Sequence, residues 1–376
     1  MSPQQAAYST EVKRSYFIDY LRAFLTMLVI AHHTAITYGA SGGWFFREPV
    51  PRDSITSMLL TMFCAVNQAY FMGMFFLIAG YYTPASFTRK GPGKFFVDRL
   101  IRLGIPLLVF GFVLGPMTAA IADMPAGNSF WDVWGSLMMR LRFIPGPLWF
   151  AQALLMFAAC YAIWAFIFGR TPKEASRPIP AARWWLLTAL LVGLFALLLR
   201  QWVPVGKEFA GLQVGYFSSY IFLFALGCVA SGSRWLERVT RTEARPWMIV
   251  CLVAIPLLPV ALKLGGGAAN FATGWSFAAI AYAFWEPLVA WGIIAGLLWV
   301  ARERFNQAHR FWQALGERAY GAYIVHPPII VGIAVTLLGW EAPPFVKFVV
   351  VAALGIISTF AVAGLLLRLP GARRIL

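Results

Sequence analysis

The fold is decided by residues 16–39, which read YFIDYLRAFLTMLVIAHHTAITYG. This stretch is apolar and long enough to cross the hydrocarbon core of a bilayer, which takes about 20 residues of α-helix. It nevertheless contains Asp19, Arg22, His32 and His33. Ionisable groups inside a membrane are costly and are retained mainly where they have a function. The stretch therefore predicts a transmembrane helix that carries part of a functional site.

The rest of the chain is also unusually apolar. Hydrophobic residues make up 60% of the 376 positions and charged residues only 12%, whereas a soluble domain carries about 25% charged residues. We predict an all-α, polytopic membrane bundle that forms one domain over residues 1–376. About ten stretches have the length of a transmembrane helix, namely 17–39, 56–83, 103–122, 147–169, 184–203, 215–231, 247–264, 274–300, 319–338 and 344–367.

The basic residues predict which way the bundle sits. Cytoplasmic loops of membrane proteins retain an excess of Lys and Arg. With the N-terminus inside, 22 of the 31 basic residues fall in inner segments and eight in outer ones. Residues 1–15 and 368–376 are then cytoplasmic, and both termini lie inside. The net charge of +16 does not predict nucleic-acid binding, because the charge is spread over short loops and not gathered on one soluble face.

Arg22 and His33 lie on one face of the first predicted helix. They are eleven residues apart, which is three turns plus about 20°, and about 16.5 Å along the axis. His32 is about 80° away from Arg22, so His33 is the better candidate for a site that Arg22 also faces. The structural alternative is that Arg22 pairs with Asp19 or with a distant carboxylate and only fixes the register of the helix.

Two further ionisable groups fall inside predicted spans. Glu286 lies near the middle of the eighth span and His326 near the middle of the ninth. If these helices face the first, Glu286 and His326 extend a polar path from Arg22 and His33 through the membrane. A purely structural role for this second pair is an equally good interpretation.

At the entrance of the third span, Arg99 and Arg102 are three residues apart in the segment VDRLIRLGIP. Residues at this spacing share a helix face, and two guanidinium groups on one face can bind a phosphorylated ligand. Ordinary anchoring of a cytoplasmic helix end by basic residues explains the same spacing. After the third span, residues 129–143 contain Trp131 and Trp134, which predict an amphipathic helix on the outer surface.

In their order along the chain, these motifs resemble the acyltransferase type 3 family of integral-membrane O-acyltransferases. The resemblance rests on an Arg and a His separated by ten residues, Arg22 and His33, and on the R-x-x-R of Arg99 and Arg102. The segments FFLIAGYY, GPLWF and YGAYIVHPP add to it. Within the family, residues 16–39 look most like the branch of glucan-modifying, succinyl-transferring proteins. The resemblance covers essentially the whole chain.

The family resemblance implies a donor and an acceptor. The donor is cytoplasmic acyl-CoA, carrying an acetyl or succinyl group, and no tightly bound cofactor or metal is implied. The acceptor is a hydroxyl of an extracytoplasmic carbohydrate or glycolipid, and the protein belongs in the bacterial inner membrane. We assign Arg99, Arg102, Lys94 and His326 to donor binding.

The catalytic residues expected from the resemblance are His33, Arg22 and Glu286. A neutral His33 can act as general base on the acceptor hydroxyl or as a transient acyl carrier. Arg22 would steer the thioester or stabilise the oxyanion that forms on it. Glu286 would orient an imidazole or hold Arg22.

Two other functions fit parts of the pattern. In a proton-coupled secondary transporter or flippase, Arg22, His33, Glu286 and His326 would form a proton relay. No internal repeat or paired broken helices, which are typical of such transporters, occur in the sequence. A non-catalytic membrane scaffold would leave His33 without a role. Acyl transfer that depends on His33 favours the enzyme, and movement of the acceptor across vesicles favours the transporter.

Overall fold

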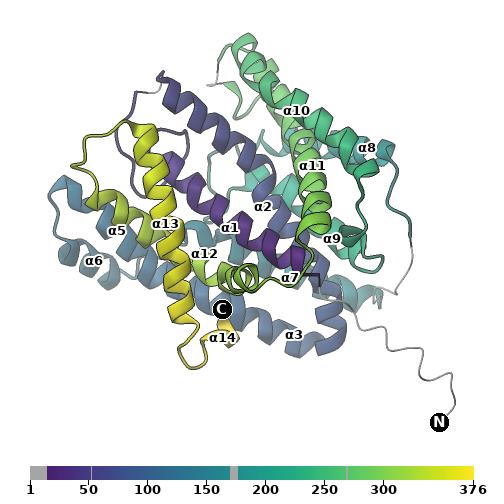
Figure 1. Ribbon diagram of the computed structural model, residues 1–376, viewed down its shortest axis with the longest axis horizontal. Coiled ribbons are helices and arrows are strands. Elements are labelled where there is room, and N and C mark those ends of the chain that lie inside the picture. Colours follow the sequence, from purple (N-terminus) through teal and green to yellow (C-terminus); the bar gives the residue numbers. More distant parts are fainter. Residues whose placement is uncertain (1–14, 52, 170–176, 268–269) are drawn as a thin grey trace.

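The protein is built of helices and connecting loops. A computed structural model describes residues 15–51, 53–169, 177–267 and 270–376. Figure 1 shows the helices packed side by side, and no strand is formed within these ranges. The predicted all-α class is therefore confirmed. The expected cytoplasmic segment 1–15, apart from Ser15, and the basic residues Arg170 and Lys173 lie outside the described residues.

Nine helices of the described chain are long and apolar enough to cross a membrane. Each agrees with one of the predicted spans, although several extend further at their ends. Together they establish a multi-pass membrane bundle. They are α2 (Ile55–Lys90), the run Pro92–Ala126, the run Gly146–Phe168 that contains α7 (Trp149–Phe168), α8 (Ala182–Leu199), the run Val214–Ser231 that contains α9 (Phe217–Ser231), α10 (Arg241–Leu264), α11 (Phe277–Phe305), α12 (Arg310–Thr336) and α13 (Pro344–Leu366).

The tenth predicted span is α1 (Tyr16–Thr37), which is not among these nine because its ionisable residues lower its hydropathy. It packs against α2, α11, α12 and α13. Asp19 approaches Gly316 and His33 contacts His326, so α1 and α12 run in the same direction. The C-terminal Leu376 lies near Gly321, on the same half of α12 as Gly316. The described chain therefore begins and ends at one end of the bundle, which requires an even number of crossings and makes α1 the tenth.

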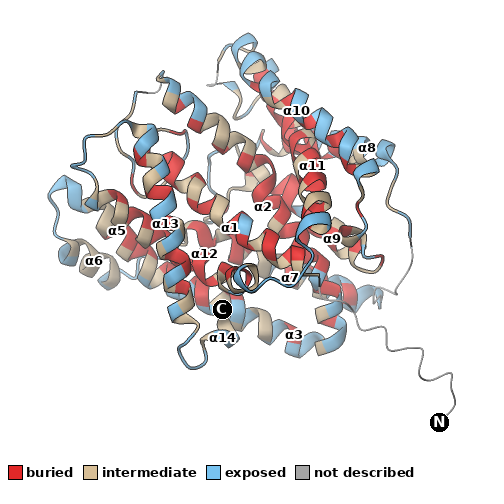
Figure 2. Ribbon diagram, viewed as in Figure 1, coloured by how far each residue is buried: buried red, intermediate tan, exposed pale blue. Residues whose placement is uncertain are grey.

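Burial separates central helices from peripheral ones. In α2, α11 and α12, 61–67% of the most apolar window is buried within the protein, against 22–33% in α7, α8, α10 and α13. Figure 2 shows the buried residues gathered along α1, α2, α11 and α12. The exposed faces of the peripheral helices are rich in Leu, Ile and Phe, as expected of surfaces that face lipid. His32 of α1, Glu286 of α11 and His326 of α12 lie buried in this protected centre.

The third span differs from the plain helix that the sequence predicted. It begins earlier, with α3 (Pro92–Arg99), and contains two π-helical turns, η1 (Leu100–Gly104) and η2 (Phe110–Leu114). Pro106 and Pro116 follow these turns and have no N–H to donate. Two carbonyls of the span bond to other elements instead. The Arg102 carbonyl accepts from the Tyr320 hydroxyl at 2.7 Å, and the Gly111 carbonyl accepts from the backbone N–H of Ile144 at 2.8 Å.

After the third span, α6 (Phe130–Met139) forms within the segment predicted to be an amphipathic helix. It packs against α5 (Gly115–Asp123). Trp131 is exposed, whereas the Nε1 atom of Trp134 is buried. The helix is confirmed, and its position at the outer membrane surface stays a prediction, as does the side of the membrane on which the termini lie.

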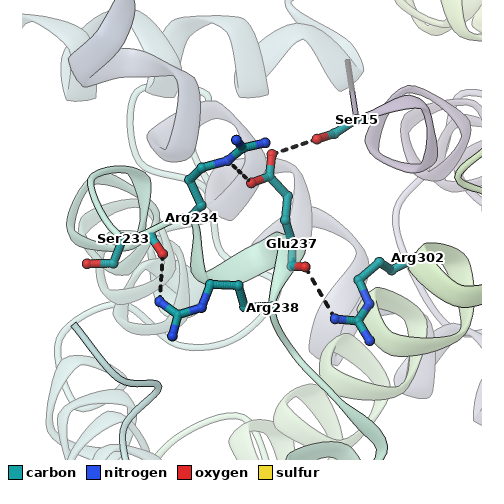
Figure 3. A network of polar contacts seen from close by, with 6 residues as sticks. All are labelled: Ser15, Ser233, Arg234, Glu237, Arg238 and Arg302. Carbon is teal, nitrogen blue, oxygen red and sulfur yellow. Dashed lines mark hydrogen bonds and ion pairs between the residues drawn. The ribbon is translucent and has the colours of Figure 1, made fainter. Parts of the chain in front are cut away.

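A polar network joins several helix ends at the end of the bundle where α1 begins. Figure 3 shows Glu237, in the turn between α9 and α10, at its centre. The carboxylate accepts from Ser15 Oγ at 2.6 Å and is paired with Arg234. The Glu237 carbonyl accepts from Arg302 at the end of α11 at 3.3 Å. Arg238 donates to the Ser233 carbonyl at 3.1 Å. Part of the basic excess at this end is therefore neutralised locally.

A buried ion pair joins α8 to α11. Arg200 directly follows α8 and is 2% exposed, and its guanidinium is paired with Glu286 of α11. Arg200 Nε also donates to the Gly215 carbonyl at 3.0 Å. The rings of Tyr216 and Tyr282 lie 5.6 and 5.0 Å from the guanidinium carbon. Two opposite charges surrounded by aromatic rings can remain buried because each compensates the other.

Removing one charge of this pair should destabilise the fold. We expect Glu286→Gln to lower the free energy of unfolding by about 3–5 kcal/mol, because Arg200 is left as an uncompensated buried charge. The measurement is thermal denaturation of the purified protein in detergent micelles. The double variant Arg200→Met, Glu286→Leu should recover most of the loss.

The matched control is the pair of half-buried Arg302 and exposed Glu303, whose N–O distance is 3.7 Å. Exposed pairs contribute about 0–1 kcal/mol, so Glu303→Gln should leave the denaturation temperature nearly unchanged. Equal destabilisation by Glu286→Gln and Glu303→Gln would contradict a structural role for the buried pair.

Candidate active site

The centre of the candidate site is a pair of histidines from α1 and α12. Nδ1 of His33 lies 3.0 Å from Nε2 of His326. The two rings are nearly parallel, with an angle of 6° between their planes and 5.1 Å between their centroids. His326 is fully buried, while His33 is partly exposed. The structure thus joins two residues that the sequence placed on separate helices and assigned to different roles.

The protonation of both rings follows from a proline. In an α-helix the carbonyl of Tyr323 would accept from the N–H of residue 327, but Pro327 has none. Nδ1 of His326 lies 2.6 Å from this carbonyl and fills the vacancy. A carbonyl only accepts, so His326 Nδ1 carries a proton and, in a neutral ring, His326 Nε2 does not.

The same reasoning extends to His33. An unprotonated His326 Nε2 accepts, so the neighbouring Nδ1 of His33 carries the proton. In a neutral ring, Nε2 of His33 is then the unprotonated nitrogen. The hydrogen-bond chain from the Tyr323 carbonyl through His326 therefore leaves His33 with one basic nitrogen at its far edge.

The adjacent His32 has different surroundings. Its ring is buried and stacks on Phe71 of α2, with centroids 5.0 Å apart. Its Nδ1 has no hydrogen-bond partner among the described residues. His33, in contrast, contacts the second histidine and stacks on Trp44 at 3.9 Å. The helical arrangement of α1 thus directs only one of its two histidines to His326.

The loop that follows α1 covers this end of the helix. Lys347 of α13 forms a 2.6 Å ion pair with Glu48, and Ser57 of α2 donates to the Gly39 carbonyl at 2.7 Å. A surface cavity of about 320 Å³ lies in the loop, lined by Gly39, Ser41, Gly42, Arg47, Glu48, Pro49 and Val50.

The GPLWF segment, residues 146–150, packs against the face of α12 that carries Tyr323 and His326. The hydroxyl of Tyr323 donates to the Pro147 carbonyl, and the ring of Phe150 lies edge-on to Tyr323 at 5.9 Å. Gly146 has a φ of +45°, and a Cβ there would come within 3.1 Å of the Phe45 ring. A glycine is needed at this position because it accepts the left-handed backbone and the close approach of Phe45.

Three residues of α12 connect the two ends of the candidate site. Tyr320, Tyr323 and His326 are spaced three residues apart, so they follow one side of the helix over about 9 Å. Tyr320 bonds to the Arg102 carbonyl, Tyr323 to Pro147 and His326 to His33. Through this row, α12 holds the R-x-x-R segment of the third span at a fixed distance from the histidine pair.

The R-x-x-R segment forms a cluster of charges at the end of the bundle where α1 begins. Asp98 lies 2.7 Å from Lys90 and 3.6 Å from Arg102. Arg99 lies over the Phe95 ring at 5.1 Å, and its Nε is buried with no hydrogen-bond partner among the described residues. Arg102 is exposed, as is Lys94. Lys90, Arg99 and Arg102 thus lie around the single carboxylate of Asp98, and Lys94 is close in sequence. The cluster therefore keeps a net positive charge that can bind an anionic ligand.

Arg22 and Glu286 do not approach the histidine pair. Arg22 is 3.6 Å from Asp19 in an i, i+3 pair, and Glu286 is paired with Arg200. The expected path through Arg22, His33, Glu286 and His326 is therefore wrong as a single chain of contacts. Its physical reason is that Arg200, near the end of the predicted span 184–203, is buried and neutralises Glu286. His326 was assigned to donor binding, but its ring contacts His33, so it lies in the histidine pair and not at the R-x-x-R segment.

Sequence reasoning missed Trp44 and the role of Tyr323. Trp44 lies in the glycine-rich loop that follows α1. Nothing in the loop sequence indicated that its indole stacks on His33, eleven residues earlier in the chain. Tyr323 could have been found from Pro327, because a proline inside a helix frees the carbonyl four residues before it. The sequence HPP after Tyr323 thus contained the signal.

Comparison with known families gives a match over nearly the whole chain. Residues 15–368 match the family model described as Acyltransferase domain. The matched range contains both histidines of the pair and the R-x-x-R segment. No solved structure matches the chain.

Curated relatives include the Glucans biosynthesis protein C of Escherichia coli O1:K1 / APEC, of O139:H28 (strain E24377A / ETEC) and of O9:H4 (strain HS). Each is 29% identical over 161 residues, which cover 41% of this chain and 39% of the relative. The chain thus spans about two fifths of the length of the curated relatives it matches. Because the family model covers far more than half of the chain, the protein belongs to the acyltransferase type 3 family of integral-membrane proteins.

Proposed function

We propose that the protein transfers an acyl group from cytoplasmic acyl-CoA to a hydroxyl of an extracytoplasmic carbohydrate or glycolipid, in the bacterial inner membrane. The observation that carries the proposal is the hydrogen-bonded pair of His33 and His326, which leaves Nε2 as the unprotonated nitrogen of a neutral His33. Family membership supports the acyl chemistry. The name of the relatives, Glucans biosynthesis protein C, supports a glucan as acceptor. The acyl group is acetyl or succinyl, and the resemblance of residues 16–39 to the succinyl-transferring branch supports succinyl.

The transfer step is acid–base catalysis by His33. Its Nε2 removes the proton of the acceptor hydroxyl while the hydroxyl oxygen attacks the thioester carbonyl carbon. The carbonyl electrons move to the oxygen, and they return as the carbon–sulfur bond breaks. The thiolate of CoA leaves and takes the proton back from His33. The products are an ester and free CoA, so neither an oxidant nor a metal enters the balance.

His326 acts as a positioning residue in this scheme. As His33 becomes an imidazolium, its Nδ1–H remains bonded to the lone pair of His326 Nε2. This arrangement holds the His33 ring in one orientation and stabilises its charge, as an orienting carboxylate does for the histidine of a serine protease. The bond from His326 Nδ1 to the Tyr323 carbonyl keeps His326 in the tautomer that this requires.

The donor binds at the other end of the row on α12. Arg99 and Arg102, with Lys94, offer charge-assisted hydrogen bonds to the phosphates of acyl-CoA. Arg22 belongs to this end, because it lies about 16.5 Å along α1 from His33. At that distance its side chain cannot reach a thioester carbonyl bound beside His33. The thioester arm would run toward His33 beside Tyr320 and Tyr323.

Replacing either histidine should slow transfer, but by different amounts. We expect His33→Ala to reduce kcat by about 10²–10⁴-fold, the usual contribution of a general base. His326→Ala should reduce it by roughly 10–100-fold, the range seen when the partner that orients a metal-bound imidazole is removed, and His326→Gln should recover part of this because its amide oxygen can accept. The assay uses purified protein, labelled acyl-CoA and candidate glucans.

His309→Ala is the control for this series, because His309 is exposed at the start of α12. It should transfer at the wild-type rate. Unchanged transfer by the His33 variant would refute the catalytic assignment. Absence of CoA binding, combined with movement of the glucan across vesicles, would support the transporter instead.

Loss of the two arginines should weaken donor binding without affecting folding. We expect the double variant Arg99→Ala, Arg102→Ala to raise the Kd for CoA at least tenfold, because charge-assisted hydrogen bonds to the phosphates are lost. Isothermal titration in micelles measures the Kd, and thermal denaturation checks the fold. Arg241→Ala, which removes an exposed charge from the start of α10, should leave the Kd unchanged. If the double variant and the control bind CoA equally well, the R-x-x-R segment only anchors the helix.

A further inference from the structure

The indole of Trp44 is stacked on the catalytic histidine. Its ring centroid lies 3.9 Å from that of His33, with 8° between the planes. The same ring is parallel to His326 within 6°, at 6.0 Å. Phe45 packs edge-on against it at 5.3 Å. Trp44 is therefore held in one orientation beside the base of the proposed reaction.

The N–H of this indole is buried and has no hydrogen-bond partner among the described residues. Buried tryptophan N–H groups usually find an acceptor. In this protein Trp185, Trp235, Trp285 and Trp291 all do so, each donating to a carbonyl or hydroxyl oxygen within 3.1 Å. Trp134 and Trp299 lack a partner as well, but Trp44 alone of the three stacks on a histidine. An unpaired donor beside a reactive base indicates that a ligand supplies the acceptor.

We propose that the Trp44 N–H donates a hydrogen bond to the carbonyl oxygen of the acyl group during transfer. This inference rests on the proposed function. An indole N–H only donates and a carbonyl oxygen only accepts, so the two groups are complementary. When the acceptor hydroxyl attacks, negative charge develops on that oxygen, and a donor already in place stabilises it without reorganisation.

The stacked geometry suits this role. A hydroxyl bound at His33 Nε2 lies in the plane of the imidazole, and an oxygen bound by Trp44 Nε1 lies in the plane of the indole. The two ring planes are parallel within 8° and their centroids lie 3.9 Å apart, so the two bound oxygens lie in adjacent, parallel planes on neighbouring rings. Trp44 then acts on the carbonyl while His33 acts on the hydroxyl.

The test removes the N–H without changing the shape of the ring. In full-length protein, Trp44 is replaced by β-(3-benzothienyl)alanine, in which sulfur takes the place of the N–H. We expect kcat to fall roughly 10²–10³-fold, the usual effect of losing one donor to an oxyanion. The Kd for CoA and the KM for the glucan should each change less than about twofold. The denaturation temperature should stay the same. Trp44→Phe, which can be made by ordinary mutagenesis, should show the same loss of kcat.

Trp299 provides the matched control, because its buried N–H is also unpaired and it lies on α11. The same replacement there should leave kcat unchanged. Transfer by the Trp44 variant at the wild-type rate, while His33→Ala is inactive, would overturn this inference and leave the proposed function standing. A raised KM for the glucan with kcat retained would also overturn it, because the N–H would then bind the acceptor. If the wild type itself transfers no acyl group, the proposed function fails and this inference fails with it.

Discussion

The hydrogen bond between His326 and the Tyr323 carbonyl is the interaction on which the site depends. It exists because Pro327 cannot supply the helical N–H, so a carbonyl inside a buried helix needs another donor. The imidazole three residues further along meets that need, and its tautomer becomes fixed. His33 is in turn oriented by His326. A local defect in the backbone of α12 thus determines which nitrogen of a residue on α1 is basic.

The same helix also sets the distance between the two ends of the site. Proline residues in the third span free carbonyls there, and Tyr320 bonds to one of them at Arg102. Tyr323 bonds to Pro147 at the start of the following span. α12 is therefore the element against which α1, the third span and the GPLWF segment are positioned. In a reaction that takes its donor from one side of the membrane and its acceptor from the other, such a rigid spacer keeps the two binding regions aligned.

The sequence predicted most of the fold, because hydropathy and charge are averaged over long segments. All ten spans were found, and nine of them are apolar enough to be recognised by hydropathy alone. Individual partners were harder to predict. The prediction that Arg22 and His33 lie on one helix is confirmed by α1, but helical geometry could not show that Arg200 folds inward to meet Glu286. Pairing across helices depends on which helices are neighbours, and no single-helix pattern contains that information. The contact between His33 and His326 was predictable only as a possibility, and the stacking of Trp44 on His33 was not predictable at all.

The central claim is that both histidines are protonated at Nδ1, so that His33 Nε2 is free to act as a base. The most direct measurement is solid-state NMR of the ¹⁵N-histidine-labelled protein in bilayers, with His33→Ala and His326→Ala samples to assign the signals. The account predicts that His33 and His326 each show a protonated Nδ1 and an unprotonated Nε2, with a hydrogen-bond coupling between His33 Nδ1 and His326 Nε2. A protonated Nε2 and a bare Nδ1 on His33 would contradict it.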